Sequence, residues 1–560
     1  MSASASNPAD LVFTNGAVYT VDAARRWARA VAVRGGRIVA VGTDDDVGDL
    51  VGSKTVVHDL EGRMLLPGFQ DAHCHPPSAG LQMIQCDLSD AHTATEYERI
   101  VRRYAVEHPD EEWIQGGGWS MDAFPRGTPT RDVLDRLMPD RPAFLPNRDG
   151  HGAWVNSKAL ELAGITRETP DPPDGRIERD ERGEPSGTLH EGAMDLVEKL
   201  MPPVSEEDME QGLRAAQEYL HSLGITAWQD AIVGGSYPSL EAYVSAARKG
   251  ELTARVVGAL WWDRHRGGEQ IEELIAKRDR SSVGRFRATT VKIMQDGVVE
   301  NFTAGVLEPY LDSDRKPTAN RGLSFVDPEL LKGHVTRLDA DGFQVHFHAL
   351  AERAVREALD AIEAARRANG MNDNRHHVAH IQVVHPDDIP RFRELGVVAN
   401  AQPLWATFEG QMVHLTIPFL GPERSEWQYP FAALVRSGAM LAFGSDWFVS
   451  SPNPMWEMAI AVNRMAPAKY ANVFGETATK EAFLPAERLD LATAIHAFTM
   501  GSAYVNHLDD VTGSIEVGKY ADLVVVRENL FDLELDELTE AKVLLTMVEG
   551  EPVFTDPSFE

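Results

Sequence analysis

The sequence has only two cysteines, Cys74 and Cys86, among its 560 residues. Two thiols cannot build the disulfide framework on which small secreted domains rely. The first ten residues also lack the charged and apolar regions of a signal peptide, and no apolar run approaches the length that spans a bilayer. We therefore expect a cytoplasmic protein with no membrane partner.

Positive charge is the second shortage. Lys and Arg number 54 against 86 Asp and Glu, which gives a formal net charge of −32. Proteins that bind nucleic acid or anionic membranes need a basic surface, so both classes are disfavoured. We attribute the excess acid to solubility, and we expect a small-molecule substrate, with a homodimer as one assembly state.

Short apolar runs separated by glycine-containing turns occupy both ends of the chain. They lie at residues 11–13, 17–19, 30–33, 38–42, 523–526 and 544–548. Such runs predict short strands. We expect the two ends to meet in one discontinuous β-sandwich formed by residues 1–62 and 508–560.

The middle of the chain, residues 63–507, alternates apolar runs with helical patterns, as βα units do. The candidate inner strands are 64–75, 225–228, 255–260, 288–293, 343–348, 377–380, 397–400 and 441–446. They predict an α/β fold built on a parallel (β/α)8 TIM barrel, which carries its chemistry at the C-terminal ends of the strands. Residues 76–201 are too many for a simple connection, so we expect an insertion over the barrel mouth that shapes substrate choice.

The most informative stretch is 64–75, an apolar run that ends in His73-Cys74-His75. Side chains two apart on a strand point to the same face, so His73 and His75 project together and make half a metal site. Cys74 should point to the other face, where it packs rather than binds metal.

Further ligand-type residues stand at the ends of later apolar runs, namely Lys292, His348, His380 and Asp446. Imidazoles and a carboxylate are the ligands that hold Zn²⁺ or a similar divalent ion. A cationic lysine would repel a metal, so Lys292 is useful only as a carbamate formed with CO₂, whose two oxygens can bridge a pair of ions. One ion per chain remains the alternative to two.

Each of these residues alone also has an ordinary structural explanation. Lys292 suits a salt bridge, and Asp446 suits a helix cap. Their joint order along the chain argues against coincidence. Among the neighbours, His346 is expected to pack one layer below His348, and Asp71 is a candidate to orient a ligand imidazole.

The chain resembles the amidohydrolase superfamily, and within it the branch that includes N-substituted formamide deformylases. The likeness covers nearly the whole chain. The motifs that carry it include Pro67-Gly68-Phe69-Gln70-Asp71-Ala72-His73-Cys74-His75, Asp149-Gly150-His151, Val291-Lys292-Ile293, His380-Ile381-Gln382 and Gly444-Ser445-Asp446. At Leu350-Ala351-Glu352 the chain departs from the Ile-Gly-Asp common in relatives, which leaves any role of Glu352 near the substrate open.

The resemblance implies a (β/α)8 barrel with a small β-sandwich built from both termini. It also implies that His73 and His75 bind one metal ion and that His348 and His380 bind the second. A carboxylated Lys292 would bridge the two ions. Asp446 would be both a ligand and a proton carrier.

These observations predict metal-assisted hydrolysis of a C–N bond in an amide- or formamide-like substrate that is not a peptide. Asp446 would take the proton of the attacking water and deliver it to the leaving nitrogen. His151, Trp119 and Trp154 are candidates for oxyanion and substrate contacts, and packing inside the insertion is the alternative for both tryptophans. Other hypotheses are a deaminase with one metal ion, an esterase or lactonase, and an inactive metal-binding regulatory protein.

Overall fold

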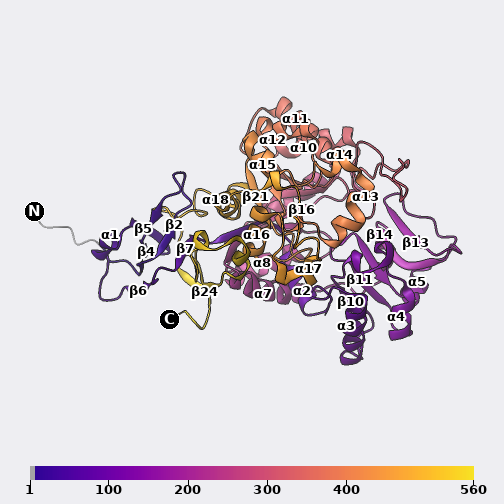
Figure 1. Ribbon diagram of the computed structural model, residues 1–560, viewed down its shortest axis with the longest axis horizontal. Helices are drawn as coiled ribbons and strands as arrows, with labels where there is room; N and C mark the ends of the chain where they lie inside the picture. Colours follow the sequence, from indigo (N-terminus) through magenta and orange to yellow (C-terminus); the bar gives the residue numbers. More distant parts are fainter. Residues whose placement is uncertain (1–6, 560) are drawn as a thin grey trace, which may run out of the picture.

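A parallel eight-stranded sheet forms the centre of the computed structural model, which describes residues 7–559 (Figure 1). Each strand pairs in parallel with the next in chain order. The strands are β8 (Phe69–Cys74), β15 (Ile225–Val233), β16 (Arg255–Trp261), β17 (Phe286–Met294), β18 (Gln344–Ala349), β19 (His377–His380), β20 (Val398–Ala401) and β21 (Leu441–Phe443).

The first and last strands of this order meet where they end, which closes the sheet into a barrel. The amide of Asp446 donates to the carbonyl of His73, and the amide of His75 donates to the carbonyl of Trp447, both at 2.7 Å. Gly444 permits this approach, because a Cβ there would lie 2.4 Å from the His73 nitrogen. The predicted (β/α)8 barrel is therefore confirmed.

A helix follows each barrel strand and covers the outside of the sheet. These helices are α7 (Glu206–Ser222), α8 (Ser239–Lys249), α9 (Ile271–Ser281), α10 (Pro328–Ala340), α11 (Glu352–Asn369), α12 (Ile389–Leu395), α15 (Phe431–Ser437) and α16 (Pro454–Asn463). In α7, the Ser205 hydroxyl accepts from the Asp208 amide and the Asp208 carboxylate accepts in return, a capping box that starts the helix. Leu213, Ala216 and Leu220 then recur at helical spacing and face the core.

Strands from both ends of the chain share one sheet beside the barrel. Its six strands, in spatial order, are β24 (Glu551–Thr555), β23 (Val543–Val548), β22 (Leu523–Val526), β7 (Met64–Pro67), β2 (Ala17–Tyr19) and β3 (Trp27–Ala28). A four-stranded sheet contains β5 (Arg37–Gly42), β4 (Ala30–Arg34), β1 (Leu11–Thr14) and β6 (Val56–Asp59). Buried side chains such as Phe13, Val31, Leu65 and Leu523, contributed by both sheets, form one apolar cluster, so the two ends of the chain stabilise each other.

The stretch 64–75 differs from the single strand that we predicted. It is two strands, with β7 in the six-stranded sheet and β8 in the barrel, and Gly68 lies between them. A Cβ at Gly68 would lie 2.4 Å from the Thr226 side chain. The chain therefore passes from one sheet to the other at a position where only glycine fits.

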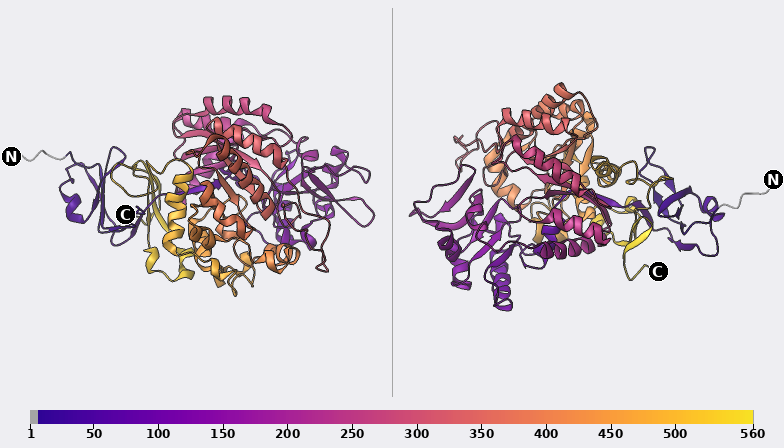
Figure 2. Two further views of the ribbon diagram at one scale, coloured as in Figure 1. Left: turned by 90° about the horizontal axis from the view of Figure 1, so that it is seen from above. Right: turned by 180° about the vertical axis from the view of Figure 1, so that it is seen from behind.

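The insertion after β8 carries a sheet of its own and lies at the opposite end of the molecule from the two terminal sheets (Figures 1 and 2). Its strands are β9 (Cys86–Asp87), β10 (Ile114–Gly117), β11 (Ala143–Pro146), β12 (Gly152–Val155), β13 (Gly175–Arg179) and β14 (Pro185–Glu191). Helices α3 (Ala94–Glu107), α4 (Arg131–Leu137) and α5 (Ser157–Ala163) belong to the same part.

Helix α2 (Pro76–Met83) leads from β8 into the insertion and crosses α7 closely. A Cβ at Gly80 would lie 1.9 Å from the carbonyl oxygen of Gly212, so the crossing requires glycine at this point. Within residues 7–559, no helix combines the length and apolar character needed to cross a membrane.

Candidate metal centre and active-site cavity

The six predicted ligand residues come together at the C-terminal end of the barrel. His73 is the penultimate residue of β8, and His75 directly follows the strand. Lys292 lies on β17 and His348 on β18, and His380 is the last residue of β19. Asp446 comes three residues after β21.

Asp446 lies at the centre of this group. Its Oδ1 is 3.0 Å from His75 Nε2 and 3.1 Å from His73 Nε2, and its Oδ2 is 3.9 Å from His380 Nδ1. The imidazoles of His348 and His380 are in contact, with ring centroids 4.5 Å apart. Ligand atoms of His73, His75 and Asp446 all lie within 4.8 Å of one another. The arrangement fits one divalent ion at these three residues, with further nitrogen donors beside it.

The charge state of the donors suits metal binding. Burial lowers the pKa of His73, His348 and His380 well below the usual histidine value, so their rings are neutral and keep a lone pair. Burial alone would raise the pKa of Asp446, but the hydrogen bond from His75 and the nearby His380 hold it below the usual value. Neutral imidazoles around an ionised carboxylate are a suitable donor set for Zn²⁺.

Lys292 is 2% exposed and lies against the histidines. Its Nζ is 3.4 Å from His73 Nε2, and it forms no ion pair with any residue that the structure describes. Burial lowers the pKa of Lys292 to about 7, although Asp446 and Asp230 oppose the shift. A lysine that is partly neutral at physiological pH can react with CO₂, which an ammonium cannot.

Hydrogen bonds behind the ligands set their orientation. The Gln402 side-chain oxygen accepts from the His380 amide at 2.9 Å and lies 3.1 Å from His380 Nδ1, which leaves Nε2 free to bind metal. The Asp71 carboxylate accepts from the His73 amide and from the Ser445 hydroxyl, and so ties the ends of β8 and β21 together. Asp71 therefore holds the backbone of His73 and the side chain of Ser445, and it does not orient a ligand imidazole as we predicted.

His346 does more than pack below His348, which is the role that the sequence predicts. Its Nε2 lies 2.8 Å from His73 Nδ1, a direct hydrogen bond to a predicted ligand. When His73 Nε2 binds a metal, Nδ1 carries the hydrogen and His346 accepts it. His346 Nδ1 has no hydrogen-bond partner, and its ring lies against that of His377.

Two of the predicted ligand residues have a strained backbone. His380 and Asp446 have φ values of 77° and 55°, a region that non-glycine residues rarely adopt. Such conformations persist where the surrounding structure holds them, and they are frequent at functional sites. In both cases the backbone directs the side chain toward the metal centre.

His151 lies on the insertion side of the site, and its ring centroid is 5.2 Å from that of His348. Its Nδ1 lies 2.9 Å from Oε1 of the buried Glu191. Burial opposes the charged forms of both groups, yet their mutual attraction raises the pKa of His151 to about 9 and lowers that of Glu191 to about 2. They form an ion pair at neutral pH.

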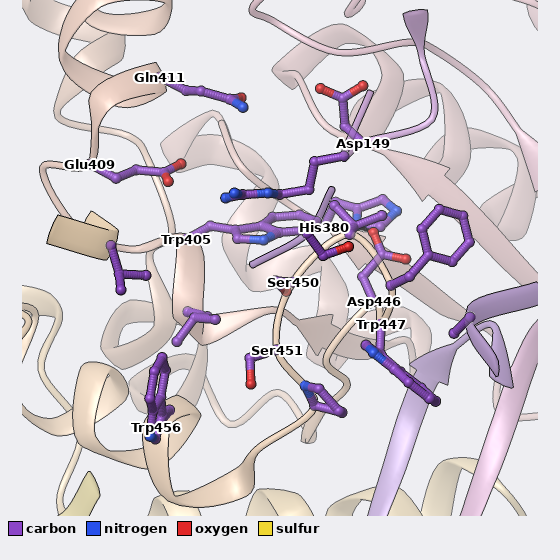
Figure 3. A pocket seen from close by; sticks show the side chains of 18 of the residues that line it. Asp149, His380, Trp405, Glu409, Gln411, Asp446, Trp447, Ser450, Ser451 and Trp456 are labelled. Atoms are coloured by element: carbon purple, nitrogen blue, oxygen red, sulfur yellow. Dashed lines mark ion pairs between the residues drawn. The ribbon is translucent and has the colours of Figure 1, made fainter. Parts of the chain in front are cut away.

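A cavity of about 510 Å³ opens above these residues. His151, His348, His380 and Asp446 are part of its lining. Figure 3 shows Trp405 beside His380, with Glu409 and Gln411 at the left of the view and Asp149 above His380 at the right. Further lining residues are Tyr219, Trp447, Phe448, Trp456 and Phe474. The cavity therefore joins a polar base to mixed aromatic and charged walls, as small-molecule sites do.

Trp119 and Trp154 do not reach this cavity. Both are fully buried in an apolar cluster of the insertion, where Trp119 Nε1 donates to the Leu145 carbonyl and Trp154 Nε1 donates to the Thr130 carbonyl. Of the two alternatives for these tryptophans, this burial agrees with packing inside the insertion and not with substrate contact, because the core covers both indoles and carbonyl groups accept from both N–H groups.

Several residues of the site were not identified from the sequence. Glu191, Gln402 and Trp405 carried no motif that pointed to the metal centre. Arg148 and Glu409 both line the cavity, and the side chain of neither forms a hydrogen bond or ion pair with a described residue. Burial raises the pKa of Glu409 to about 7, although Arg148 opposes the shift. The one sequence signal near either residue is the motif Asp149-Gly150-His151, which Arg148 directly precedes.

Glu352 lies away from the substrate. It is fully buried, its Oε1 accepts from the Leu307 amide at 3.1 Å, and it does not line the cavity. Its role is to hold the segment that follows β17.

Comparisons with known proteins agree with this architecture. A family model described as "Amidohydrolase family" matches residues 56–554. The chain is 31% identical over 558 residues to Protein LONG AFTER FAR-RED 3 of Arabidopsis thaliana, covering 98% of this chain and 92% of that protein. It is 28% identical over 555 residues to the N-substituted formamide deformylase of Arthrobacter pascens, covering 97% of each. An uncharacterised metal-dependent hydrolase from Pyrococcus furiosus superposes with a TM-score of 0.69 at 25% identity, covering 93% of this chain and 99% of that one.

Proposed function

The chain belongs to the amidohydrolase family, and from this premise we propose that it is a metal-dependent hydrolase that cleaves the C–N bond of an amide or formamide. The observation that carries the proposal is that six ligand-type residues converge at the C-terminal end of the barrel, where His348, His380 and Asp446 line one cavity together with His151. Similarity to a formamide deformylase over nearly the whole chain supports this choice of bond.

We propose His73, His75 and Asp446 as ligands of one divalent ion, and His348 and His380 as ligands of a second. Lys292, as a carbamate, would bridge the two. Zn²⁺ suits a set of imidazoles and carboxylates. When bound, the metal supplies an activated water at neutral pH and polarises the carbonyl group.

Asp446 is the proposed proton carrier. It is ionised at neutral pH, lines the cavity and contacts two predicted ligands, so it can accept a proton from the attacking water. The same carboxyl group then returns the proton to the leaving nitrogen. This delivery matters because an amine leaves poorly when it is unprotonated.

His151 is proposed to contact the carbonyl oxygen of the substrate. It approaches from the insertion, whereas Asp446 approaches from the barrel, so a carbonyl carbon between them would have a proton acceptor on one side and an imidazole on the other. The aromatic wall that contains Trp405, Phe448 and Trp456 suits an apolar N-substituent.

The first experiment is elemental analysis of protein purified without a chelator or a metal-binding tag, followed by an amide and formamide panel read by release of formate or amine. About two divalent ions per chain with amine release supports the proposal. Full metal content without turnover of any amide, formamide or ester would overturn it and favour a metal-binding protein without hydrolase activity.

One observation favours a second candidate. Within residues 7–559, His73, His75 and Asp446 are the one group of histidines and acids close enough together to share an ion. A single ion at such a site is the arrangement expected of a deaminase, which would release ammonia. About one ion per chain, together with ammonia release from an amine-bearing heterocycle, would select this alternative.

A further inference from the structure

Glu191 is held rigidly behind His151. It is the last residue of β14, and its amide donates to the carbonyl of His151 at 3.1 Å. Its Oε1 also accepts from the Thr303 hydroxyl at 2.8 Å. A Cβ at Gly297 would lie 2.4 Å from the same oxygen, so the loop after β17 can reach Glu191 only with glycine there.

The loop after β17 therefore connects the pair His151 and Glu191 to the barrel. Thr303 and Asn301 contact Glu191 from this loop, and Asn301 Nδ2 also donates to the carbonyl of His151 at 3.3 Å. This loop follows β17, the strand that carries Lys292. The carboxylate is thus fixed by groups from the insertion and by groups from the barrel.

This geometry decides which nitrogen of His151 faces the cavity. An ionised carboxylate can only accept hydrogen bonds, so the Nδ1 of His151, 2.9 Å away, carries a hydrogen. Nε2 forms no hydrogen bond with any residue that the structure describes, and His151 lines the cavity. Nε2 is therefore the free atom of the ring.

We propose that Glu191 is a positioning residue, which fixes the orientation of His151 so that Nε2 is presented to the carbonyl oxygen of the substrate. The inference rests on the proposed amide hydrolysis for its kinetic consequence, but the orientation itself can be observed without turnover. Removing the hydrogen-bond partner behind a metal-binding imidazole typically lowers metal affinity or activity by about 10- to 100-fold. We expect a loss of the same order when the carboxylate behind His151 is removed.

A second pair in the same sheet provides a matched control. His190 Nε2 lies 3.2 Å from Glu178 Oε1, and neither residue lines the cavity. Burial opposes ionisation of Glu178, but His190 and Arg176 lower its pKa to about 2, much as His151 does for Glu191. Glu178→Gln therefore removes an acidic neighbour of a second histidine of the insertion, to which Glu178 makes an ion-pair contact without a hydrogen bond, and leaves the bond between His151 and Glu191 in place.

The kinetic test is a double-mutant cycle on the best substrate of the amide panel, with metal content and circular dichroism measured for each variant. We expect Glu191→Gln to lower kcat by about 10- to 100-fold with little change in KM. In a His151→Gln background the same change should cost less than about twofold, because Glu191 would act only through the missing ring. Glu178→Gln should leave kcat unchanged.

The structural test uses wild-type protein labelled with ¹⁵N in its histidine rings. We expect a strongly downfield Nδ1–H resonance that disappears in both His151→Gln and Glu191→Gln and persists in Glu178→Gln. Absence of this resonance from wild-type protein, or an equal kinetic cost of Glu191→Gln with and without His151, would overturn the assignment. If the wild-type protein cleaves no amide, the proposed function fails, whereas the resonance still decides the orientation.

Discussion

Replacing Lys292 by methionine should change stability in opposite directions with and without metal. In the metal-free protein, Lys292 is buried against imidazoles and has no ion-pair partner among the described residues. Its pKa falls from 10.5 to about 7, mainly through burial. Because each tenfold change in proton affinity is worth about 1.4 kcal/mol, the folded metal-free protein carries a penalty of about 5 kcal/mol at this residue.

Methionine has a similar length and no charge, so it removes this penalty but does not fill the space perfectly. We expect Lys292→Met to raise the free energy of unfolding of the metal-free protein by about 2–4 kcal/mol at pH 7. When Zn²⁺ is added, the wild-type protein should gain stability and the variant should gain less, because the variant has lost the proposed bridging group.

The effect depends on pH with a defined sign. Below about pH 7, Lys292 is protonated in both the folded and unfolded chain, and the full penalty applies. Between about pH 7 and 10.5 the unfolded chain binds a proton that the folded chain lacks, so the wild-type protein becomes more stable as pH rises. The advantage of methionine should therefore shrink with rising pH and vanish above about pH 10.5.

The assay is urea unfolding of chelator-treated and Zn²⁺-loaded protein, followed by tryptophan fluorescence at several pH values. Lys480→Met is the control, because Lys480 is exposed and Glu476 is its one ion-pair partner among the described residues, so its replacement should change stability by less than about 0.5 kcal/mol. A Lys292→Met variant that is less stable than wild type without metal at pH 7 would show that Lys292 is not an uncompensated buried amine.

Three further predictions concern other residues of the site and the insertion. Asp446→Asn should lower kcat by about 100- to 10,000-fold in a steady-state assay, because an amide cannot accept the proton, and retention of most activity would remove Asp446 from the mechanism. His346→Phe should weaken metal binding by about 10- to 100-fold in a chelator competition, since His73 loses its partner at Nδ1; unchanged affinity would mean that their 2.8 Å contact does not support the ligand. Trp119→Phe should leave KM unchanged and cost about 1–3 kcal/mol in urea unfolding, because a buried indole and its bond to Leu145 are lost. A raised KM at wild-type stability would instead return Trp119 to the substrate site.

The main features of the fold were predictable from local patterns. Apolar runs alternating with helical periodicity predicted the barrel, and His73, His75, His348 and His380 were found because parallel strands of one barrel end at the same face. The split at Gly68 was not predictable, since two strands in line look like one apolar run. The separation depends on Thr226 of the neighbouring strand, which lies far away in the sequence.

The roles of residues in the insertion depended on packing that no local pattern reports. Trp154 closely follows the motif Asp149-Gly150-His151, and the indoles of Trp119 and Trp154 suit a binding site as well as a core. The insertion sheet turns both indoles inward and brings Glu191 to His151 from 40 residues along the chain. Sequence spacing carries no information about which strand will pair beside another.

By itself, the sequence determined the kinds of groups available for chemistry and the strand ends on which they stand, because these follow from residue identity and short-range periodicity. Only the tertiary structure decided the partners: Asp446 between two histidines, His346 behind His73 and Glu191 behind His151. Each partnership joins residues on different elements. Its existence depends on barrel closure and on the docking of the insertion, where a shift of one residue in register would replace one neighbour by another.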